Sequence, residues 1–95
     1  MSLYLRANTY AADATVYSKT CLFYGCVLET NGTNNAVATF YDGNPGTRIL
    51  KLTCKGADLS YGALLREPIK INNLLRFTLS GTGANIDVFW AYIFS

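Results

Sequence analysis

The chain has 95 residues, of which 51% are hydrophobic and only 15% are charged, whereas soluble domains carry about 25% charged residues. A chain of this length forms one domain, and its surface must be unusually neutral. There is no histidine and the net charge is +2, so the commonest general base and metal ligand is missing and the basic stripe of an electrostatic nucleic-acid binder is not expected.

The distribution of apolar residues is typical of an all-β fold. Short segments rich in Val, Ile, Thr, Tyr and Phe recur between clusters of Gly, Asn, Asp and Pro, and helical periodicity is almost absent. We therefore predict a single antiparallel β-sandwich or jelly-roll-like domain of about seven to eight strands over residues 13–95. Residues 1–12 show no regular alternation, and we expect them to form an extended N-terminal arm that lies against another surface.

The predicted strands are separated by turns or loops. Gly25 lies in the middle of the second strand and indicates a bulge or a close backbone approach. Pro68 confines its segment to a sheet edge or to the start of a strand, because proline has no amide proton for the ladder. Residues 55–66 have a mixed polar pattern and are predicted to form a long loop. The expected strands, in chain order, are residues 14–19, 21–30, 36–41, 48–54, 67–71, 75–80 and 84–94.

The closing strand, residues 84–94, changes character half-way along. One face is apolar throughout, whereas the other begins with Asn85 and Asp87 and continues with apolar residues. Exposed apolar patches of this kind usually mark contact surfaces, and a second layer of the same core is the alternative interpretation. The residues that we expect at an interface are Leu3, Tyr4, Leu5, Phe89, Ile93 and Phe94.

Catalytic and metal sites are not expected. The three cysteines, Cys21, Cys26 and Cys54, cannot all pair within one chain, and we predict buried thiols in a protein made in a reducing compartment. A zinc site would lack a fourth ligand, and the acidic residues include no adjacent pair and no Asp-x-Asp spacing. We therefore predict no enzyme, no metal and no cofactor. The N-terminal residues lack a signal-peptide pattern and no apolar run approaches a membrane span, so we do not expect a membrane as partner. The small net charge of +2 leads us to expect no nucleic acid as partner either.

Three segments taken together resemble those of a known group of proteins. They are residues 37–43, which read Val-Ala-Thr-Phe-Tyr-Asp-Gly, residues 68–74, and residues 77–88. In this order and at this spacing they are similar to small β-sandwich structural proteins of tailed bacteriophage virions, and the similarity spans residues 20–92. The resemblance implies a capsid cement or decoration protein, made in the host cytoplasm and placed on the capsid surface. Its implied partners are the major capsid protein and copies of itself, as a homotrimer, and it carries over no catalytic residues.

A second function stays open from the residues alone. Tyrosines near residues 41–46 and 55–66 could stack on sugars, as in a receptor-binding or carbohydrate-binding module of a head fibre or tail. The low charge and the apolar half of the last strand favour the structural virion protein, because small domains gain stability by oligomerising.

Overall fold

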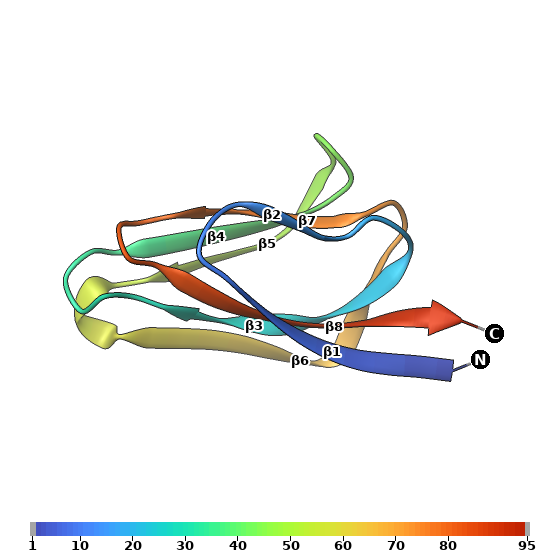
Figure 1. The fold of residues 1–95 in the computed structure, drawn as a ribbon, viewed down its shortest axis with the longest axis horizontal. Helices are drawn as coiled ribbons and strands as arrows, with labels where there is room; N and C mark the ends of the chain where they lie inside the picture. The colour runs from blue at the N-terminus through green and yellow to red at the C-terminus, as the bar shows by residue number, and fades with distance from the viewer. Residues whose placement is uncertain (1, 95) are drawn as a thin grey trace.

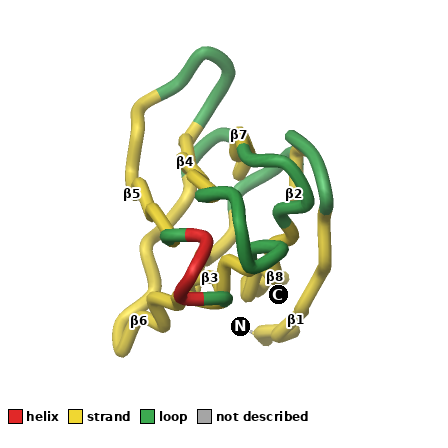
Figure 2. Tube along the Cα trace, turned by 90° about the vertical axis from the view of Figure 1, so that its left-hand side faces the viewer, coloured by secondary structure: helices red, strands yellow, loops and turns green. Residues whose placement is uncertain are grey.

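The computed structural model describes the backbone of residues 2–94 and the side chains of residues 5–92. Eight strands occupy this part of the chain, and no α-helix is present in it. One short 3-10 helix, η1 (Gly56–Asp58), precedes the sixth strand (Figure 2). The strands are β1 (Ser2–Tyr10), β2 (Ala14–Tyr17), β3 (Cys21–Glu29), β4 (Ala36–Asp42), β5 (Thr47–Cys54), β6 (Ser60–Ile71), β7 (Leu75–Ser80) and β8 (Asn85–Phe94).

The strands form two antiparallel sheets that pack face to face (Figure 1). Sheet A has the order β1-β8-β3-β6, and sheet B has the order β2-β7-β4-β5. The first strand thus pairs with the last, the second with the seventh, the third with the sixth and the fourth with the fifth. This is the strand arrangement of a jelly roll. The prediction of an antiparallel β-sandwich or jelly-roll-like domain is therefore confirmed.

Residues 2–10 of the predicted N-terminal arm form an edge strand of the sandwich. β1 pairs with β8 along its whole length, from Ser2 opposite Phe94 to Tyr10 opposite Ile86, with no shift of register. The segment is extended, as expected, but it belongs to sheet A instead of lying apart from the domain. The boundary predicted between residues 12 and 13 consequently falls in the short connection between β1 and β2.

The prediction of a long loop over residues 55–66 was wrong for its second half. β6 begins at Ser60 and continues to Ile71 at the edge of sheet A. Most of its side chains are exposed on both faces, so the strand lacks the alternation of apolar and polar residues that reveals a half-buried strand. Pro68 lies within this edge strand, which confirms the edge position predicted for it.

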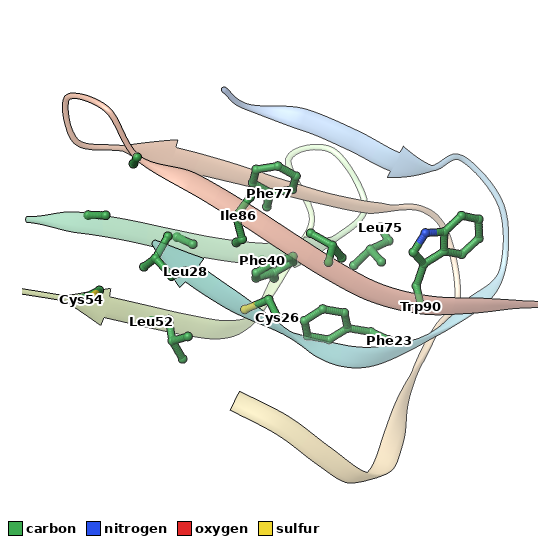
Figure 3. Close-up of a cluster of buried hydrophobic side chains, with 14 of the residues drawn as sticks. Phe23, Cys26, Leu28, Phe40, Leu52, Cys54, Leu75, Phe77, Ile86 and Trp90 are labelled. Atoms are coloured by element: carbon green, nitrogen blue, oxygen red, sulfur yellow. The ribbon is translucent and has the colours of Figure 1, made fainter. Parts of the chain in front are cut away.

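The space between the sheets is filled mainly by aromatic and aliphatic side chains (Figure 3). Phe40 lies at the centre, with its ring 4.6 Å from that of Phe23 on the opposite sheet and 5.4 Å from that of Phe77 on the neighbouring strand. The predicted core face of the closing strand is confirmed, since Ile86 and Val88 are fully buried and Trp90 is only 6% exposed. Apolar burial of this kind is the main term that holds so small a domain together.

Gly25 marks a bulge in β3, as predicted. The pairing of β3 with both of its neighbours shifts register between Phe23 and Gly25. On the β6 side the partners change from Ile69 to Leu64 across this point, so β6 accommodates the larger irregularity. A bulge of this kind bends the strand that carries it and increases the local twist.

Candidate functional site

The outer face of sheet A is the surface that the closing strand was expected to expose. Because side chains alternate along a strand, burial of Val88 and Trp90 in the core directs Phe89 and Ala91 outward. The register places Leu5 of β1 and Leu22 of β3 on either side of Ala91. We call the resulting surface the apolar face, and it comprises Leu5, Ala7, Leu22, Val27, Leu64, Phe89 and Ala91.

The apolar face crosses all four strands of sheet A and is exposed most strongly at its two sides. Leu5 on β1 is 69% exposed and Leu64 on β6 is 67% exposed. Phe89 is half-buried between them, and Ala91 is 1% exposed, although neither of the two described sheets forms a layer over this side of sheet A. The face is thus a continuous apolar surface and not a second core, which decides between the two interpretations drawn from the sequence.

Polar groups limit the apolar face at one end of the sheet. The hydroxyl of Thr9 donates a hydrogen bond of 2.6 Å to Oδ1 of Asp87, and Glu29 lies exposed near them on β3. From this end towards the chain termini, which lie side by side in Figure 1, the outward positions become apolar. The change of character predicted half-way along the closing strand is therefore confirmed for the described side chains.

Two of the six predicted interface residues, Leu5 and Phe89, belong to the apolar face. The side chains of Leu3, Tyr4, Ile93 and Phe94 lie outside the described residues, and their backbones pair within β1 and β8. Reasoning from the sequence missed Leu22, Val27 and Leu64. The apolar residues on both faces of β3 were a signal for the first two, whereas the loop predicted for β6 concealed Leu64.

The inward side of β1 is polar but is tied to the aromatic residues of β8. Nε1 of Trp90 donates a 2.7 Å hydrogen bond to Oδ1 of Asn8, and the guanidinium of Arg6 donates a 3.1 Å bond to the hydroxyl of Tyr92. The ring of Tyr17, from the edge of sheet B, packs 4.8 Å from that of Trp90. These contacts hold β1 in place and so fix the position of Leu5.

The outer face of sheet B has the opposite character. Apart from Val37, its outward residues on the central strands are hydroxylic or cationic, and Arg76 stands among them with its guanidinium 4.1 Å above the ring of Tyr41. The Nε of Arg76 also donates a 2.9 Å hydrogen bond to the carbonyl of Gly43, which ties the β4–β5 turn to β7. The two faces of the sandwich therefore differ sharply, one apolar and the other polar.

The tyrosines that could have formed a sugar-stacking platform are not brought together. Tyr41 lies on β4 in sheet B beneath Arg76, whereas Tyr61 lies on β6 in sheet A and is 55% exposed. A platform requires rings that present neighbouring surfaces. Of these two tyrosines, only Tyr61 has an exposed side chain.

The chain matches no known protein family model, and no curated protein is significantly similar to it. Among the described residues no group of three or more Cys, Asp or Glu side chains is placed to hold a metal ion, and no helix there is long and apolar enough to cross a bilayer.

The three cysteines are buried free thiols, as predicted. Burial, together with the charge of Asp42, raises the pKa of Cys21 to about 11, and burial raises the pKa of Cys26 to about 12. Thiols react as thiolates, so neither group is activated for nucleophilic chemistry near neutral pH.

Burial of the thiols predicts a loss of stability at high pH. The folded chain keeps protons that the unfolded chain releases above its ordinary thiol pKa of about 9, so the free energy of unfolding should fall as pH rises from about 9 towards 11. Urea titrations between pH 7 and 11 measure this. The Cys26→Ala variant, although less stable, should lose less stability over that range. Equal pH dependence in both proteins would contradict the prediction.

Proposed function

We propose that the chain is a structural virion protein of a tailed phage, a cement or decoration protein that oligomerises on the capsid shell. In this proposal the apolar face lies against the major capsid protein, and the polar face of sheet B points towards solvent. No chemical step is involved, because the function is to add contact area between shell subunits.

The single observation that carries the proposal is the apolar face. Soluble monomers rarely expose a contiguous apolar patch of more than a few hundred Å², and larger ones mark interaction surfaces. Here such a surface runs across four strands, with Leu5 and Leu64 more than half exposed. Burying these side chains against a partner would contribute roughly 1.5–3 kcal/mol each at full burial, a useful contribution for a domain of this size.

The fold is compatible with this role. Jelly rolls are found in viral capsid proteins and in lectin domains, and a fold does not by itself specify a function. The resemblance of three segments to phage structural proteins favours the capsid, and the contrast between the two sheet faces supports a protein with one docking side.

Co-sedimentation with phage capsids assembled without the chain tests the proposal. The wild-type protein should pellet with the capsids, and Leu64→Lys should weaken binding on the order of tenfold or more, because a charge would be buried without a partner. Thr53→Lys is the matched control, since it places the same charge on an exposed strand residue of sheet B. Equal binding by both variants would reject the apolar face as the docking surface.

A further inference from the structure

β1 presents a long and unprotected sheet edge. In the part of the chain that the structure describes, its only sheet neighbour is β8, so no strand of the described sheets pairs with its other side. Such an edge is a template for another strand unless proline, a bulge or charged side chains obstruct it. β1 has nine residues, contains no proline, and pairs with β8 without a register shift. Arg6 is its single charged residue.

The edge β6 of sheet A is obstructed. It contains Pro68 and three charged residues, Arg66, Glu67 and Lys70. Its pairing with β3 is also interrupted between Ile69 and Leu64, so its free side cannot present a regular ladder. In the end-on view of Figure 2, β6 and β1 lie on opposite sides of the sandwich.

The two edges of sheet B are obstructed as well. β2 is four residues long, and its register with β7 shifts between Thr15 and Tyr17. β5 carries Arg48 and Lys51, and its register with β4 is irregular near Tyr41. Among the four edges of the described sheets, β1 is thus the one left open.

We propose that β1 pairs with β1 of a second copy of this chain, antiparallel, about a two-fold axis at Leu5. This inference rests on the proposed role in assembly and names the contact between copies. A head-to-tail contact would need a second open edge, which the described sheets do not offer, whereas a two-fold contact uses the same edge twice. The two A sheets would join into one eight-stranded sheet with both apolar faces on the same side.

The register follows from charge and polarity. A two-fold axis at Arg6 would set two like charges directly opposite each other, which destabilises a strand pair. An axis at Ala7 would put the apolar Leu5 opposite the polar Thr9, whose hydroxyl is hydrogen-bonded to Asp87. An axis at Leu5 sets Leu5 opposite Leu5 and pairs residues 2–8 of one copy with residues 8–2 of the other, so the apolar positions meet.

The size of this contact suits a specific interface. Pairing residues 2–8 would form about six to eight backbone hydrogen bonds, because alternate residue pairs of an antiparallel ladder exchange two bonds each. A typical protein interface has about ten. A two-fold contact closes at two copies, so it predicts a dimer instead of the trimer implied by the resemblance.

Sedimentation equilibrium over a concentration series tests the proposal. The wild-type protein should approach twice the 10.4 kDa mass of the chain. Leu5→Lys should weaken the dimer on the order of tenfold, because it places two lysines opposite each other and removes an apolar pair. Leu64→Lys, at a residue of nearly equal exposure on the far edge of the same sheet, should leave the dimer unchanged. Mixing Leu5→Lys with Leu5→Glu should restore a dimer, since position 5 faces itself.

A monomer at all concentrations, a trimer, or equal dimerisation of Leu5→Lys and Leu64→Lys would overturn the proposal. The result for the dimer can be distinguished from the result for the proposed function. A monomeric protein that still pellets with capsids, and loses this binding with Leu64→Lys, rejects the β1 pairing alone. A dimer that does not bind capsids rejects the capsid role alone.

Discussion

Replacing Trp90 with alanine is expected to lower the free energy of unfolding by about 3–5 kcal/mol. Trp90 is 6% exposed, its ring packs against that of Tyr17, and its Nε1 donates a hydrogen bond to Oδ1 of Asn8. Its removal leaves a cavity between the sheets and also releases the central contact that holds β1 against β8. Because a chain of this length has about 5–14 kcal/mol of stability in total, the loss is a large fraction of it. Urea denaturation followed by tryptophan-independent far-ultraviolet circular dichroism measures the change.

Trp90→Phe provides the matched control. It retains an aromatic ring in the core but removes the hydrogen bond to Asn8, so we expect a loss nearer 1–3 kcal/mol, about the cost of a broken bond at a buried site plus reduced volume. Amide hydrogen exchange should quicken in β1 for both variants. A loss below about 1 kcal/mol for Trp90→Ala would show that the ring does not pack as described.

Gly25→Ala is expected to destabilise the chain by about 3–5 kcal/mol, combining backbone strain with overpacking. Gly25 has a φ of +122°, a conformation that residues with a β-carbon rarely adopt. A β-carbon at this position would overlap the carbonyl oxygen of Ala63 on β6. The substitution would therefore push β6 away from the centre of sheet A, and thermal and urea denaturation would both report the change.

Gly32→Ala separates strain from overlap. Gly32 also has a positive φ, of +91°, but a β-carbon there would have the side chain of Leu59 at 3.4 Å as its nearest neighbour. Only the conformational cost then applies, and we expect a loss of about 1–2 kcal/mol. Similar losses for the two variants would mean that the close approach of β3 and β6 contributes nothing.

Much of the fold follows from local pattern. The alternation along residues 75–80 and the Gly-rich and Asn-rich turns predicted β7 and its neighbours. The order of the strands does not follow in this way. Pairing of β1 with β8 joins residues from opposite ends of the chain, and local periodicity in the sequence does not indicate such a contact.

The parts that were missed share one physical cause. β1 and β6 are edge strands, and an edge strand can keep polar residues on both faces because one side of it meets solvent. On β1 the inward residues Arg6 and Asn8 are polar, and their partners Tyr92 and Trp90 satisfy them across the strand pair. On β6 seven of the twelve residues are exposed. Without knowledge of the neighbouring strands, β1 was therefore predicted as an arm and the first half of β6 as a loop.

The candidate surface could be predicted from the sequence only in part. Phe89 could be named because the closing strand has excess apolar residues, and the low charge of the chain indicated that such residues would need cover. Leu5 could be named because the N-terminal segment was expected to lie against another surface. Leu22 and Leu64 complete the apolar face only after β3 and β6 are placed beside each other. The surface is therefore a property of the register between strands and not of any one segment.

The central claim is that the apolar face of sheet A is a docking surface, and comparing capsid binding by Leu64→Lys and Thr53→Lys tests it most directly. Both changes add one lysine at an exposed strand position, on opposite faces of the sandwich. We predict that Thr53→Lys pellets with capsids as the wild type does and that Leu64→Lys remains in the supernatant. Equal pelleting of the two folded variants, or no pelleting of the wild type, would contradict the claim.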